Sequence, residues 1–173
     1  MAYRRIRIYG DPVLRKVAKP VEQIDATIKE LAQDMIETMY ANDGVGLSAT
    51  QLGEEIRIFV MDPHEEDGRQ QPWVFINPVI HNRSGSVEME EGCLSLPGIR
   101  ADVKRAEEFD FEASDLNGLT VQFRAQGLIA RIIQHENDHL DGKMFVDYFS
   151  PVKRILIKEQ LKELEAEALQ SQK

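Results

Sequence analysis

Two histidines and a glutamate near the end of the chain have the spacing of a metal-binding motif. His135, Glu136 and His139 form an H-E-x-x-H pattern. On a helix of about 3.6 residues per turn, the two histidines lie one turn apart on the same face and can reach one metal ion. Glu136 lies about 100° around the helix, where its carboxylate can contact a water on that ion without being a ligand. The pattern predicts a catalytic metal site; a hydrogen-bonded pair of core histidines is the alternative.

A catalytic metal site usually has three protein ligands and one open position, so the two histidines need a partner. Phe145 stands where the extended form of the motif has a further histidine. Cys93 is the better candidate, because it lies in the segment 91–95, whose glycine lets the backbone approach an ion closely. Two alternatives stay open: Cys93 is a small buried hydrophobic residue, or the last helix supplies an acidic ligand. The acidic candidates are Glu159, Glu163, Glu165 and Glu167.

The elements that position these residues follow from the spacing of apolar side chains. Apolar residues recur at helical spacing after the N-cap Asp25, which predicts a helix over 25–41. A second helix follows Gly127 and carries the H-E-x-x-H pattern, and a third begins at Pro151 and reaches about 171. Short β-branched or aromatic runs predict strands at 56–61, 73–80, 86–89, 108–113 and 119–123. This order predicts an α+β fold with mainly antiparallel strands.

Length and composition exclude several classes of protein. The chain has 173 residues, which predicts one domain spanning 1–173. Its 30 acidic and 21 basic side chains give a net charge of -9, so nucleic acid is not expected as the primary ligand. No apolar run approaches the roughly 20 residues of a membrane helix. A single cysteine and the lack of a secretory signal at the amino terminus predict a reducing compartment, the cytoplasm.

Three segments together resemble the peptide deformylase family of bacterial type. The segment 44–51 alone reads as a helix C-cap and turn, but it resembles the family motif G-x-G-x-[AS]-A-x-Q. The segment 91–95 is similar to E-G-C-L-S, and 134–139 to Q-H-E-x-D-H. The resemblance implies mainly antiparallel sheets packed around a central H-E-x-x-H helix, with an N-terminal and a C-terminal helix. It also implies removal of the formyl group from N-formylmethionine at the start of new proteins.

The resemblance gives the motif residues catalytic roles. The metal ligands would be Cys93, His135 and His139. A divalent ion lowers the pKa of a water that it binds, and Glu136 would take up the proton as the water attacks the formyl carbon. The Gln51 carboxamide and the Leu94 N–H would donate hydrogen bonds to the carbonyl oxygen.

Substrate contacts are expected around the same centre. The resemblance implies that Gly46 contacts the peptide backbone and that Arg100 braces the site by pairing with Glu91 or Asp43. A pocket for methionine needs apolar side chains near the metal. Motif position and helical projection bring four apolar residues there: Val45, Met89, Leu128 and Ile132. Ordinary core packing is the alternative for each of them.

The metal and the partners are less closely determined. Thiolate and imidazole ligands suit zinc and also iron, nickel and cobalt; the resemblance favours ferrous iron in the cell. In the last helix the basic stripe Arg154, Lys158 and Lys162 lies beside an acidic stripe. Because these charges nearly cancel, a solvated helix is favoured over a ribosome anchor, and the ribosome stays a candidate partner. The alternatives are an H-E-x-x-H metallopeptidase of another class and a non-enzymatic metal-binding domain.

Overall fold

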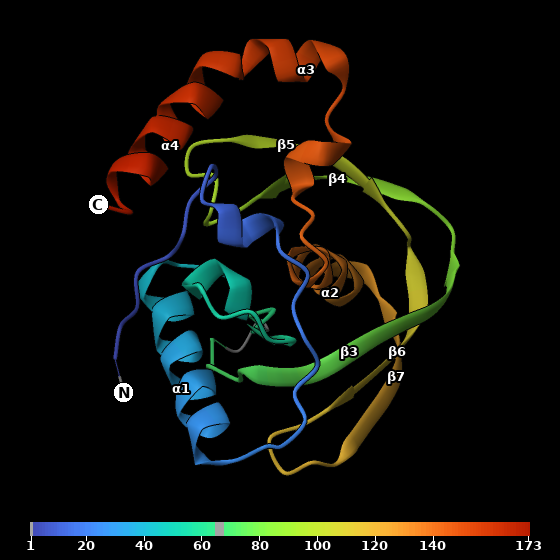
Figure 1. Ribbon diagram of the computed structural model, residues 1–173. Coiled ribbons are helices and arrows are strands. Elements are labelled where there is room, and N and C mark those ends of the chain that lie inside the picture. Colours follow the sequence, from blue (N-terminus) through green and yellow to red (C-terminus); the bar gives the residue numbers. More distant parts are fainter. Residues whose placement is uncertain (1, 65–67) are drawn as a thin grey trace.

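The computed structural model describes residues 2–64 and 68–173 and combines helices with antiparallel sheets (Figure 1). The helices are α1 (Ala26–Ala41), α2 (Gly127–Leu140), α3 (Pro151–Leu156) and α4 (Lys158–Gln170). The strands are β1 (Gly46–Ser48), β2 (Ile58–Met61), β3 (Trp73–Ser84), β4 (Val87–Gly92), β5 (Arg100–Arg105), β6 (Glu108–Ser114) and β7 (Thr120–Gln126). Short 3-10 turns occupy Pro12–Arg15, Ala49–Leu52 and Phe145–Tyr148. The predicted α+β class is confirmed.

The strands form two antiparallel sheets around α2. One sheet has the order β1-β2-β3-β6-β7, and the other pairs β4 with β5. Figure 1 shows α2 near the centre of the molecule, with the strands curving around it. The helix packs on the five-stranded sheet through an apolar cluster that includes Phe59, Phe109, Phe111, Ile132 and Ile133. The central position predicted for the motif helix is therefore observed.

Helix α2 is buried around its whole circumference over most of its length. It begins at Gly127, whose φ of 60° lies in the left-handed region that glycine tolerates best. Its buried stretch is continuous from Ala130 to Asn137 and includes polar and charged side chains. A buried polar group needs a hydrogen-bond partner, because losing water otherwise costs about 1–3 kcal/mol. The buried polar side chains of α2 therefore need partners inside the fold, and among its described side-chain atoms only His139 Nδ1 is buried without a hydrogen bond.

Helix α1 lies where its capping and apolar spacing predict it. The Asp25 side chain accepts a hydrogen bond from the Ile28 N–H at 3.1 Å and so caps the first turn. Leu31, Met35 and Met39 recur every four residues and are buried against β1 and β2. The end of α1 thus leads directly into the small-residue segment that contains β1.

The carboxy-terminal region is two helices rather than the single helix predicted from 151 to about 171. Ile157 separates α3 from α4, with φ -102° and ψ 4°, and its side chain is buried. This break lets Leu164 and Ala168 of α4 pack into the protein. Ser171 also accepts a hydrogen bond from Arg5 of the amino-terminal segment. Among the residues described, no helix is long and apolar enough to cross a membrane.

Candidate metal centre and active site

Cys93, His135 and His139 converge, although the cysteine and the histidines come from distant parts of the sequence. Helix α2 holds the two imidazoles 5.1 Å apart between ring centroids, and Cys93 follows the end of β4. The donor atoms of all three lie within 4.8 Å of one another, and the Cys93 Sγ to His139 Nε2 distance is 3.3 Å. Ligand bonds of about 2.0–2.3 Å to one tetrahedral ion separate donor atoms by about 3.3–3.8 Å. The Cys93–His139 distance lies in this range, and the three donor atoms are close enough together to hold one ion.

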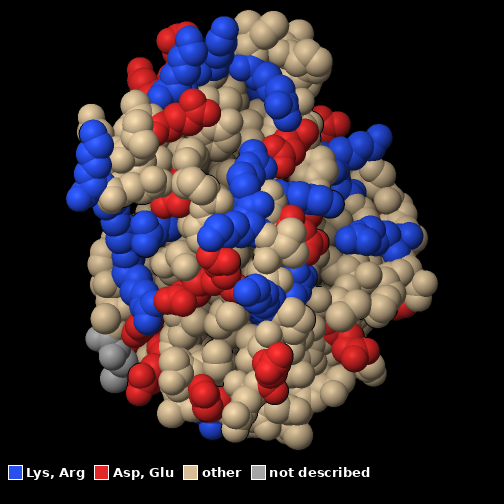
Figure 2. Space-filling model, in the orientation of Figure 1, with Lys and Arg blue, Asp and Glu red and all other residues tan. Residues whose placement is uncertain are grey.

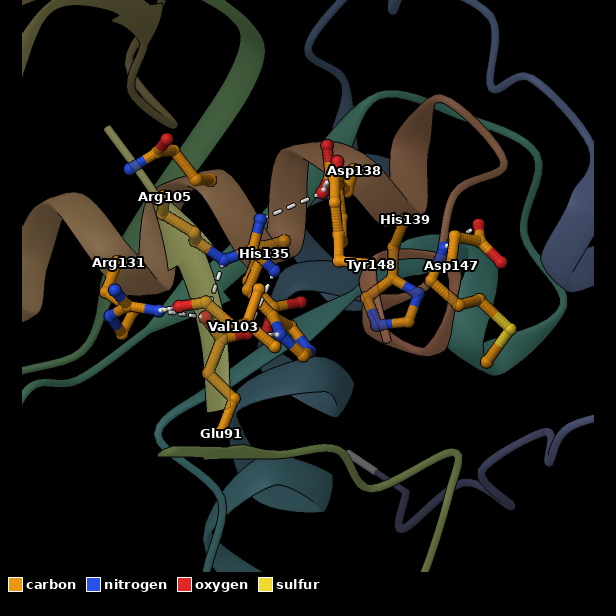
Figure 3. A network of polar contacts seen from close by, with 12 residues as sticks. Glu91, Val103, Arg105, Arg131, His135, Asp138, His139, Asp147 and Tyr148 are labelled. Carbon is orange, nitrogen blue, oxygen red and sulfur yellow. Dashed lines mark hydrogen bonds and ion pairs between the residues drawn. The ribbon is translucent and has the colours of Figure 1, made fainter. Parts of the chain in front are cut away.

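The two histidines have different surroundings. Burial lowers the pKa of His135, but hydrogen bonds with Cys93 and Glu91 outweigh it and raise the pKa to about 10, so a metal ion would have to replace a proton on this ring. His135 Nδ1 bonds to Glu91 Oε1 at 2.8 Å, which leaves Nε2 for an ion (Figure 3). Burial lowers the pKa of His139 well below its usual value, so this imidazole is neutral, the form that binds metals. A carboxylate behind a ligating histidine is the usual way in which proteins fix the ring orientation and raise its basicity.

Glu91 is a buried anion held by several donors. Its carboxylate accepts hydrogen bonds from Arg105 Nε at 2.6 Å and Nη2 at 2.9 Å, and also from Arg131 Nη1. Burial alone raises the pKa of this carboxyl group, but the hydrogen bonds from His135 and Arg105 outweigh it and lower the pKa to about 2. Glu91 therefore stays ionised and keeps its orientation toward His135.

Arg105 and Arg131, which the sequence pattern does not predict at the site, connect Glu91 to the rest of the fold. Arg105 Nη1 also bonds to Asp138 Oδ2 at 2.9 Å (Figure 3). Arg131 donates to the backbone oxygens of Val87, at 2.8 Å, and Val103, at 2.9 Å. Both arginines thus tie the β4–β5 sheet to α2. Arg131 lies four residues before His135, so the sequence places this charged side chain on the same face of the motif helix.

The pairing predicted for Arg100 is wrong. Its Nε donates to Glu90 Oε1 at 2.8 Å, instead of pairing with Glu91 or Asp43. The β4–β5 register sets Arg100 opposite Gly92, so Arg100 lies on the same sheet face as Glu90. Glu91 points to the opposite face, where Arg105 takes the bracing role.

Glu136 and Gln51 lie beside Cys93, His135 and His139. Glu136 is 4% exposed, and its Oε2 accepts a hydrogen bond from Ser48 Oγ at 2.7 Å. Burial raises the pKa of Glu136, which suits a group that must take up a proton. The Ser48 N–H donates to Gln51 Oε1 at 2.9 Å, so the Gln51 amide nitrogen points to Ser95 Oγ, at 3.0 Å, and Cys93 Sγ, at 3.8 Å. The orientation of the Gln51 donor is therefore fixed.

A cavity of about 620 Å³ opens beside these groups. Its lining includes the predicted catalytic residues and four of the predicted substrate contacts: Val45, Gly46, Leu128 and Ile132. Leu94 and Arg100 also line it. Met89 is not among the described residues of this lining; it lies on β4 with its side chain partly exposed. The cavity is large enough for an extended peptide end with one apolar side chain.

Comparison with known proteins identifies the family. The model of the polypeptide deformylase family matches residues 3–155. The chain belongs to this family. The peptide deformylase of Alkalilimnicola ehrlichii is 52% identical over 164 residues, covering 95% of this chain and 92% of that protein. The crystal structure of a Legionella pneumophila peptide deformylase is similar with a TM-score of 0.87 and 42% identity, covering 99% of both chains.

Membership of the peptide deformylase family confirms the predicted activity. The chain is a hydrolase that removes N-formyl groups from nascent formylmethionyl peptides, and the family consists of metalloenzymes. The three family motifs meet around one cavity, since Gly46, Gln51, Cys93, His135 and Glu136 all line it.

Replacing Arg105 with Met should destabilise this deformylase by about 3 kcal/mol, because it leaves the buried Glu91 and the partly buried Asp138 short of a partner. The Arg105 and Glu91 side chains are only 4% and 5% exposed. Arg100→Met is the matched control: the Arg100–Glu90 pair is 64% and 60% exposed, so its loss should cost under about 0.5 kcal/mol. Urea unfolding of the metal-free proteins measures the change in the free energy of unfolding for both variants. If both variants lost the same free energy of unfolding, the buried Arg105–Glu91 pair would contribute no more to stability than an exposed ion pair.

Proposed function

We propose that Cys93, His135 and His139 hold the divalent ion with which this deformylase hydrolyses the formyl amide. The convergence of their donor atoms within 4.8 Å carries this proposal. When bound, the ion supplies a Lewis acid that lowers the pKa of water and polarises a carbonyl group. We propose ferrous iron in the cell; zinc, nickel or cobalt suits the same ligands in a purified sample.

Glu136 moves the proton in this scheme. Its carboxylate accepts a proton from the attacking water as the water oxygen bonds to the formyl carbon. The same carboxyl group then gives that proton to the amine as the carbon–nitrogen bond breaks, so formate and a free amino terminus leave. The Gln51 amide nitrogen and the Leu94 N–H donate to the formyl oxygen as it gains negative charge.

The methionine side chain of the substrate occupies the apolar part of the cavity. Val45, Leu128 and Ile132 line this part, and Leu128 is half-exposed. Gly46 supplies backbone contact. A Cβ at Gly46 would lie 2.6 Å from Glu136 Oε1, so any other residue here would displace the Glu136 carboxylate. Specificity for methionine then comes from the size of an apolar pocket next to the reacting group.

The direct test of this function is formate release from a formyl-methionyl-alanyl peptide by the iron-loaded protein. We expect release of formate, and a rate at least about 10²-fold lower for the same peptide carrying an acetyl group, because the added methyl group must fit beside the metal. Fully metal-loaded protein that releases no formate would overturn the proposal.

A finer proposal is that the enzyme meets nascent chains at the ribosome in the cytoplasm, although the charge balance of the last helix favours a solvated helix. Helix α3 exposes Val152, Ile155 and Leu156 beside Lys153 and Arg154, and Figure 2 shows uncharged surface there with Lys and Arg next to it. Exposed apolar side chains flanked by basic ones suit contact with a larger assembly. Arg154→Glu should reduce co-sedimentation with ribosomes several-fold and leave peptide hydrolysis unchanged. Unchanged co-sedimentation would favour a solvated helix.

A further inference from the structure

Ser48 contacts the proton-transfer residue but has no part in the scheme above. It is the last residue of β1 and is fully buried. Its Oγ lies 2.7 Å from Glu136 Oε2 and 2.9 Å from the Glu136 backbone oxygen. A serine hydroxyl has one hydrogen to donate, and both acceptors within its reach belong to Glu136. The hydroxyl therefore donates to Glu136 whether its hydrogen points to Oε2 or to the backbone oxygen.

The second carboxylate oxygen of Glu136 is confined from the same strand. Gly46 and Ser48 are two residues apart, so they lie on the same face of β1. Oε1 of Glu136 lies so close to Gly46 that a Cβ there would approach it to 2.6 Å. One oxygen thus has a hydrogen-bond donor at Ser48, and the other has space only because residue 46 lacks a side chain. Both Gly46 and Glu136 line the cavity.

We propose that Ser48 is a positioning residue for deformylation, whose hydroxyl holds the Glu136 carboxylate with Oε1 directed toward the cavity. This inference rests on the proposed role of Glu136 as the proton-transfer group. A buried carboxylate without a donor has no fixed orientation and is poorly solvated. A base that is misplaced by about 1 Å loses up to 10²-fold in rate, because proton transfer depends on hydrogen-bond geometry.

Ser48→Ala should lower kcat for a formyl-methionyl peptide by about tenfold, leave KM within about twofold and leave one metal ion per chain. Thr50→Val is the matched control. Thr50 is also fully buried, and its hydroxyl bonds to the His139 backbone oxygen, at 3.3 Å, on the same helix. It should lower the melting temperature about as much as Ser48→Ala but keep kcat within about twofold.

Coupling to Glu136 gives a test that does not depend on small stability changes. In a Glu136→Gln background, adding Ser48→Ala should change the residual rate by less than about twofold, because the group that Ser48 orients is already gone. Ser48→Thr, which keeps the hydroxyl, should recover most of kcat if it folds. An unchanged residual rate in the double variant supports the proposal whether or not Ser48→Thr folds.

Three results would overturn the assignment of Ser48. The first is a Ser48→Ala enzyme with kcat within twofold of the parent, and the second is a full tenfold loss that persists in the Glu136→Gln background. The third is loss of metal from Ser48→Ala, which would give Ser48 a role in the metal site instead. A near-normal rate for Glu136→Gln alone would remove the proposed mechanism and this inference with it, and is distinguishable from these three results.

Discussion

Glu136→Gln should lower the deformylation rate by roughly 10²- to 10⁴-fold or more, with the metal content unchanged. Gln has nearly the same volume and its amide oxygen can still accept the hydrogen bond from Ser48. It cannot take up a proton, and the proposed mechanism needs this group twice, in attack and in departure of the amine. The upper part of the range is therefore expected.

The same preparation of Glu136→Gln must be assayed for rate and for metal, because loss of metal would also abolish activity. A residue that only contributes to the helix would change the rate by less than about threefold, the scale of a substitution costing under ~0.5 kcal/mol. Full metal content with a near-normal rate would remove Glu136 from the mechanism.

Cys93→Ala should release the metal, which is the second large effect. Two imidazoles alone form a weak site, because each ligand contributes several kcal/mol of binding. We expect roughly 10²- to 10³-fold weaker affinity, and therefore loss of most of the ion on dialysis and loss of activity with it. Metal content per chain after dialysis is the measurement.

Glu163→Gln is the matched control for Cys93→Ala, because an acidic residue of α4 is the alternative third ligand. Glu163 is exposed on α4, and the three-residue group that could hold an ion among the described residues is Cys93 with His135 and His139. Glu163→Gln should keep its metal and its activity. Stoichiometric metal in Cys93→Ala, with loss in Glu163→Gln, would favour the other class of H-E-x-x-H metallopeptidase.

Local signals in the sequence predict the helices and the longer strands. Asp25 caps α1, apolar spacing marks α1 and α2, and β-branched or aromatic runs mark β2, β3, β6 and β7. Strands β1 and β5 are not predicted. Strand β1 has only three residues in a segment that resembles a turn, and β5 alternates polar with small or apolar side chains without a long apolar run. Tertiary pairing determines both strands.

Some residues of the site can likewise be predicted from the local sequence, and others depend on contacts between distant segments. His135, Glu136 and His139 are predictable because one helix fixes their spacing. The partners of Glu91 are not, because the choice between Arg100 and Arg105 depends on the register of β4 against β5. A shift of one residue in that register would exchange the two sheet faces, and the sequence contains no local signal for the shift.

X-ray absorption at the metal edge of the zinc-loaded protein tests whether Cys93 and the two histidines hold the catalytic ion. The spectrum should contain one sulfur at about 2.3 Å and two imidazole nitrogens at about 2.0–2.1 Å, with a further oxygen at the open position. A spectrum with nitrogen and oxygen ligands and no sulfur would contradict the assignment of Cys93 as a ligand.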